Sequence, residues 1–230
     1  MIAMNDWRHD PIRTEKDMAA LVSAYGFLPL LQNDIPGFSV EEHTAPEVWF
    51  ADGVDGPWEW KGPVIQSTGA AYGKFFHGAS GFISPAWYAD FANYRRDGCD
   101  LDDRFADGLV RYEDKYLFDL LDGHAPILST ELKRLGGFGN GGRKGFDARI
   151  ARLQMGGYAL VSDFAYRHDR YGNRYGWGIA RYSTPEKRFG AAFTDAVYRR
   201  SPEASKERIL TYLKELLPQA GEKQLRRALG

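Results

Sequence analysis

Hydrophobic residues recur at helical spacing near the start of the chain, where Thr14 is a favourable N-cap. Asp17, three residues later, resembles the second half of a capping box. The side chains that repeat every three to four residues are Met18, Leu21, Val22 and Tyr25. The pattern therefore predicts a helix from residue 14 to Gly26, a residue that commonly ends helices.

Residues 27–65 contain several prolines, which interrupt helices. We therefore expect loops and short strands there rather than a long helix. The prolines are Pro29, Pro36, Pro46, Pro57 and Pro63. Residues 71–77 and 81–84 are rich in aromatic and apolar side chains around Gly78, which predicts a strand, a turn and a second strand. Pro85 then suits the first position of a helix.

Two further segments complete the N-terminal half. The acidic residues 97–107 are expected to form a solvated loop, and residues 109–121 a strong helix. The stripe of that helix predicted to be buried consists of Tyr112, Tyr116, Leu117, Leu120 and Leu121.

The C-terminal half has a clearer pattern of helices and strands. Capping and glycine signals predict helices at 128–136 and 145–154, and extended runs at 158–166 and 175–182 flank a turn-rich tip. In the second helix Arg149 and Arg152 lie off the apolar stripe and are expected to point outward. A final amphipathic helix is expected at 205–217.

Helix, loop, helix and hairpin in this order are typical of a winged helix-turn-helix. We therefore predict an α+β protein in which an acidic, mixed α/β segment (residues 1–125) packs on a basic winged-helix segment (residues 126–230).

Charge divides the chain at the same place, although the whole carries a net charge of only −1. Residues 1–125 hold 10 Lys and Arg against 21 Asp and Glu, and residues 126–230 hold 20 against 10. This asymmetry indicates a surface for a polyanion on the basic half, or docking of the two halves by complementary charge.

The basic residues fall where a winged helix would meet DNA, because phosphates set affinity and register. The candidate DNA-binding residues are Arg143, Lys144, Arg149, Arg152, Arg167, His168, Arg170 and Arg174. Two interpretations stay open: binding of duplex DNA, and a protein-contact module whose arginines are simply solvated.

Neither a cofactor nor a metal is expected. Residues 137–142 match the dinucleotide pattern G-x-G-x-x-G, but they follow a predicted helix rather than a strand. The single Cys99 excludes an internal disulfide and a zinc site built on cysteines, and the five histidines lack metal-ligand spacing. Because the sequence shows neither a secretory leader nor an apolar run of about eighteen residues, we expect a cytoplasmic protein without a membrane span.

Several short motifs resemble the AlkZ-related group, divergent relatives of the winged-helix DNA glycosylases of the AlkZ type, which excise alkylated or crosslinked bases. The resemblance covers about residues 20–190. Its motifs are residues 58–61 (Trp-Glu-Trp-Lys), 72–76 (Tyr-Gly-Lys-Phe-Phe), 81–84 (Gly-Phe-Ile-Ser), and 129–135 leading into the hairpin. It implies a setting in DNA repair and duplex DNA as partner.

The glycosylases of that group carry a Gln-x-Gln or Gln-x-Asp motif shortly after an early helix, and this chain has Gln32, Asn33 and Asp34 at a comparable place. The middle residue is normally apolar, and the full glycosylases are longer. The resemblance implies that Asp34 would activate a water and that Gln32 would position it against an extruded base. The alternative is an ordinary turn, since Asn, Asp, Pro and Gly dominate residues 33–37.

Overall fold

A computed structural model of the protein describes residues 10–51, 53–139, 141–172 and 174–230. A six-stranded sheet in the order β1-β3-β2-β5-β6-β4 runs through it, and every pair of neighbours is antiparallel. The strands are β1 (Phe27–Pro29), β2 (Ala71–Phe76), β3 (Ala79–Ile83), β4 (Ile127–Leu128), β5 (Leu160–His168) and β6 (Arg174–Ser183). The α+β class predicted from the sequence is confirmed.

Seven helices precede β4 in the described chain. They are α1 (Glu15–Tyr25), α2 (Val40–His43), α3 (Pro46–Trp49), α4 (Pro57–Thr68), α5 (Pro85–Arg96), α6 (Leu101–Ala106) and α7 (Tyr112–His124). The predicted capping box begins α1, where Thr14 Oγ1 accepts from the amide of Asp17 and the Asp17 carboxylate accepts from the amide of Thr14.

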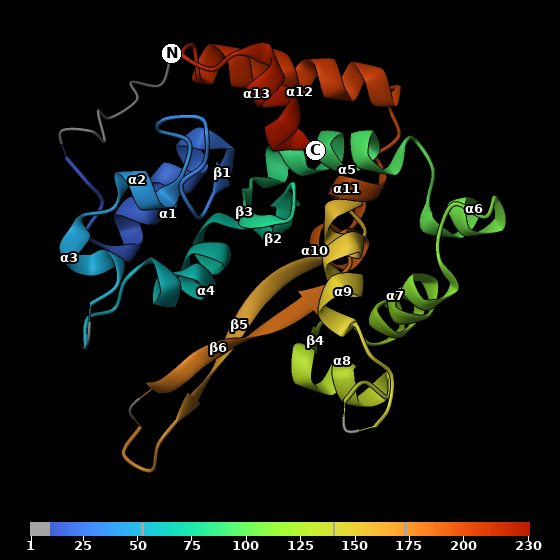
Figure 1. The fold of residues 1–230 in the computed structure, drawn as a ribbon, viewed down its shortest axis with the longest axis horizontal. Coiled ribbons are helices and arrows are strands. Elements are labelled where there is room, and N and C mark those ends of the chain that lie inside the picture. Colours follow the sequence, from blue (N-terminus) through green and yellow to red (C-terminus); the bar gives the residue numbers. More distant parts are fainter. Residues whose placement is uncertain (1–9, 52, 140, 173) are drawn as a thin grey trace.

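Six further helices follow β4 in the described residues. They are α8 (Ser129–Leu135), α9 (Phe146–Met155), α10 (Pro185–Phe189), α11 (Ala191–Thr194), α12 (Pro202–Leu216) and α13 (Glu222–Leu229). In Figure 1, α12 and α13 lie beside α5 at one end of the molecule, and the β5–β6 hairpin projects from the opposite end.

Two hydrophobic cores support these elements. The larger core is formed by side chains of α1, α4, β2, β3 and α5. It also includes Leu160 and Val161 of β5 and Ile209 and Leu213 of α12. The smaller joins α7, α8 and α9 through Leu121, Leu132 and other apolar side chains. One residue pair, Tyr72 and Val161, places β2 beside β5, so the sheet continues from residues before position 125 to residues after it.

Residues 27–65 differ from the prediction of loops and short strands, because α4 is a helix of 12 residues. Pro57 occupies its first turn, where a missing N–H costs nothing. Pro63 lies inside the helix and leaves the carbonyl of Glu59 without an intrahelical donor. The hydroxyl of Tyr166 on β5 donates to that carbonyl at 2.9 Å, which compensates for the loss.

Two other predictions in the acidic half were wrong. Residues 101–106 form α6 rather than a loop, because Asp100 caps the helix by accepting from the amide of Asp103 and Leu101 is buried. Tyr112 is 65% exposed rather than buried, because α7 begins at this residue and its first turn lies outside the apolar contact.

Candidate nucleic-acid interface

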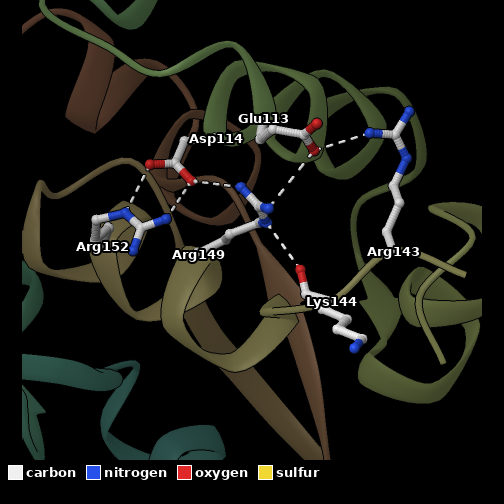
Figure 2. A network of polar contacts seen from close by, with 6 residues as sticks. All are labelled: Glu113, Asp114, Arg143, Lys144, Arg149 and Arg152. Carbon is white, nitrogen blue, oxygen red and sulfur yellow. Dashed lines mark hydrogen bonds and ion pairs between the residues drawn. The ribbon is translucent and has the colours of Figure 1, made fainter.

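Three of the candidate arginines converge on the first turn of α7 (Figure 2). Arg152 forms a bidentate ion pair with Asp114: its Nε and Nη2 each lie 2.7 Å from a carboxylate oxygen. Arg143 Nη1 lies 2.8 Å from Glu113 Oε2. Arg149 stands between them, 3.7 Å from each carboxylate, and its Nε donates to the carbonyl of Lys144 at 3.3 Å.

The local sequence explains the placement of these groups. Acidic side chains are favoured at a helix N-terminus, and Glu113 and Asp114 lie in the first turn of α7. On α9, Phe146, Ile150 and Leu153 are buried, which turns the neighbouring arginine positions toward α7. Arg149 and Arg152 are off the apolar stripe, as predicted, but their side chains are only 20% and 34% exposed.

The network has a net charge of about +1, because three guanidinium groups face two carboxylates and two of the three positive charges are compensated. Hydrogen bonds from Arg152 to the Asp114 carboxylate raise the pKa of Arg152 above its ordinary value. Asp114 is itself buried, and its carboxylate is paired with both Arg149 and Arg152. The network therefore fixes α9 against α7. Lys144, just before α9, is exposed like Arg143 but forms none of these ion pairs.

The hairpin tip carries the second group of candidate residues. Arg167, His168 and Arg170 are exposed. Arg170 lies over the ring of Tyr171, with 4.6 Å between the guanidinium carbon and the ring centroid. In the part of the chain that the structure describes, neither Arg167 nor Arg170 is paired with a carboxylate. Arg174 begins β6.

An aromatic cavity lies next to the hairpin, and the sequence analysis did not predict it. It has a volume of about 430 Å³ and lies between the α3–α4 region and β6. Trp58 and Trp177 meet edge to face at 6.0 Å, and Phe50 packs against both. Trp177 is 64% exposed and Phe50 is 74% exposed, values that no pattern in the sequence could give.

Gln32 and Asp34 are exposed and lie on the segment between β1 and α2. The backbone amide of Gln32 donates to Glu41 Oε2 at 2.7 Å. The Asp34 carboxylate is ion-paired with Arg227 of α13, and Gln224 donates to the Asp34 carbonyl at 2.6 Å. The candidate residues thus occupy three separate places: this segment, the α7–α9 network and the hairpin tip.

The family model described as AlkZ related matches residues 12–230. The chain belongs to the AlkZ-related family. No curated protein and no solved structure matches it. The AlkZ-related match extends beyond residues 20–190, the range of the resemblance seen in the motifs, and includes the C-terminal helices α12 and α13.

The described residues of this AlkZ-related protein show neither a membrane-spanning helix nor a metal-binding cluster. None of its described helices is long and apolar enough to cross a membrane. Within the same residues, His, Cys, Asp and Glu side chains form no group of three or more that could hold a metal ion.

Proposed function

We propose that this AlkZ-related protein binds duplex DNA through the tip of the β5–β6 hairpin and the start of α9, in a DNA-repair setting. The resemblance of its motifs to winged-helix DNA glycosylases supports a duplex as the ligand. Membership of the AlkZ-related family itself rests on the family match over residues 12–230.

In this proposal α7, β4, α8, α9, β5 and β6 act as a winged helix. Their order along the chain and the pairing of β4 with β6 support that assignment. The connection between α8 and α9, residues 136–145, is longer than the three or four residues of a compact helix-turn-helix. The α7–α9 ion pairs hold α9 in place despite this long connection, so Arg149 and Arg152 act as positioning residues.

The observation that carries the proposal is the group of exposed cations on a hairpin that projects from the body of the protein (Figure 1). Exposed arginines are suited to phosphate oxygens, to which they can donate two hydrogen bonds in parallel. A projecting hairpin also brings these charges to DNA without a steric clash from the rest of the chain.

Binding to a labelled duplex, followed by fluorescence anisotropy from 50 to 200 mM salt, tests the proposal. Four cations are assigned to phosphates: Lys144, Arg167, Arg170 and Arg174. The slope of log K against log salt is then expected to be about −3.6, which lowers the affinity roughly 150-fold across this range. Absence of binding at 50 mM salt would contradict the proposal.

Replacing Glu113 by Gln is expected to tighten duplex binding roughly 3- to 10-fold at 100 mM salt. Glu113 neutralises Arg143 and approaches Arg149, so its loss adds one uncompensated positive charge beside Lys144. Anisotropy titrations of the variant and the wild type at equal salt measure the change.

The matched control is Glu215→Gln on α12, which removes the same charge from an exposed position at the far end of the molecule. A Glu113→Gln variant that binds no better than the control would show that α9 does not face the DNA.

A further inference from the structure

A second cavity lies between α4, β2, α9 and the β5–β6 hairpin, with a volume of about 390 Å³. Its walls combine aromatic rings with a few polar groups. The lining residues on which the argument depends are Trp58, Lys61, Tyr72, Lys74, Gln154 and Phe164.

Lys61 lies in this cavity with its amine enclosed by aromatic rings. Its Nζ is 5.0 Å from the ring centroid of Trp58, 4.9 Å from that of Phe164 and 5.8 Å from that of Tyr72. Trp58 and Lys61 are one turn apart on α4, so they share a face of that helix. Among the residues that the structure describes, Lys61 Nζ has neither a carboxylate ion pair nor a hydrogen-bond acceptor.

The surroundings of Lys61 favour the neutral amine. Burial lowers the pKa of Lys61 to about 8, the charge of Lys74 lowers this pKa as well, and Glu59 raises it. The ring faces act in the opposite direction, because they attract the ammonium. Across the cavity Asp147 is 86% exposed and paired with Lys133 at 3.0 Å, so its charge is largely compensated.

The two tyrosines that line the cavity do not supply a negative charge. Burial raises the pKa of Tyr72 well above its ordinary value, and it raises the pKa of Tyr182 to about 12. Both hydroxyls therefore stay protonated near neutral pH, where the lowered pKa of Lys61 leaves roughly a tenth of its amine with a free lone pair.

We propose that Lys61 is a nucleophilic amine that forms an imine with an aldehyde bound in this cavity. The nitrogen lone pair forms a bond to the carbonyl carbon while the C=O π pair moves to oxygen, which takes up one of the two amine protons; the other N–H proton leaves in the dehydration that follows. The resulting carbinolamine then loses water as the N=C double bond forms. One water is released, and no oxidant or reductant is consumed.

Two sources of aldehyde fit the cavity. One is a small aromatic aldehyde, whose ring would stack on the aromatic side chains that line the cavity. The other follows if the proposed DNA binding holds: the aldehyde of a DNA strand is the ring-opened sugar at a position that has lost its base. The imine chemistry of Lys61 itself does not depend on DNA binding.

Competition labelling of the wild-type protein tests the proposal. The probe is pyridoxal 5′-phosphate with sodium cyanoborohydride, which reduces an imine to a stable secondary amine, and peptide mass spectrometry locates the label among the 10 lysines. At pH 7.5 we expect Lys61 to be labelled at least about tenfold faster than the exposed Lys144, because burial leaves more of the Lys61 amine neutral than is usual for a lysine.

The pH dependence provides the second readout. Labelling of Lys61 is expected to reach half its maximal rate near pH 8, well below the midpoint of an ordinary lysine side chain. Lys61→Arg keeps the charge in the cavity and should abolish the fast phase, and Lys144→Arg should leave it intact. Equal rates at the two lysines, or a midpoint near pH 10.5 for Lys61, would overturn the proposal.

A duplex with one base-free position, incubated with cyanoborohydride, distinguishes the source. A DNA adduct at Lys61 assigns the aldehyde to the nucleic acid, and fast labelling by pyridoxal 5′-phosphate without a DNA adduct assigns it to a small molecule. Because the labelling needs no DNA, failure of duplex binding and failure of the lysine chemistry give different results.

Discussion

Replacing Arg96 by Met is expected to lower the free energy of unfolding by about 3 kcal/mol, since a buried acceptor loses its donor and the half-buried Glu186 loses its ion-pair partner. Arg96 ends α5 and is 2% exposed. Its Nη2 donates to the carbonyl of Gly157 at 2.9 Å, and its Nη1 donates to Glu186 Oε1 at 2.7 Å. These bonds tie α5 to the turn after α9 and to α10.

The rings around Arg96 add to this effect. The guanidinium carbon lies 4.7 Å from the ring centroid of Tyr158 and 5.2 Å from that of Phe193. Met fills part of the volume but donates no hydrogen bond, so the carbonyl of Gly157 stays buried without this donor. Glu186 is 38% exposed and can regain water, which is why the estimate stays near 3 kcal/mol.

Thermal unfolding measures the change, which should lower Tm by about 6–12 °C in a chain of this length. Arg199→Met, at an exposed position, is the control and should stay within about 0.5 kcal/mol of the wild type. Arg96→Lys is also expected to destabilise the protein, because an ammonium cannot reach Gly157 and Glu186 with the same planar geometry. A Met variant as stable as the control would contradict this account of Arg96.

The double substitution Arg167→Ala and Arg170→Ala is expected to weaken duplex binding roughly 30- to 150-fold at 100 mM salt. This assumes about 1–1.5 kcal/mol for each exposed, charge-assisted contact to a phosphate. Both side chains are exposed at the hairpin tip and take part in neither core, so the fold and Tm should not change. Anisotropy titrations give the affinity.

The control for this variant removes the same charge elsewhere. Lys214→Ala with Lys223→Ala changes exposed positions on α12 and α13, at the end of the molecule opposite the hairpin (Figure 1). If both double variants lose affinity equally, binding depends on net charge and the hairpin is not the contact surface.

Elements whose signals are local could be predicted from the sequence. The capping box at Thr14 and Asp17, the turn at Gly78 and the long hairpin each depend on residues close together in the chain, and all three lie where the pattern placed them. α4 was missed because the acceptor freed by Pro63 is satisfied by Tyr166, a residue far along the sequence.

The candidate site shows the same division between local and distant causes. Periodicity placed Arg149 and Arg152 off the apolar stripe, but it could not show that α7 would lie beside them with two carboxylates. Residues 58–61 form an aromatic motif that is visible in the sequence. The enclosure of Lys61 also requires Tyr72 and Phe164, which come from the sheet. Such contacts depend on how elements pack, which a single sequence does not specify.

The most direct test of DNA binding by the hairpin compares the salt dependence of duplex binding by the wild type and by the Arg167→Ala, Arg170→Ala variant. Loss of two phosphate contacts should make the slope of log K against log salt shallower by about 1.8, from about −3.6 to about −1.8. Parallel lines for the two proteins would mean that the hairpin arginines do not contact the phosphates, and the proposed interface would be wrong.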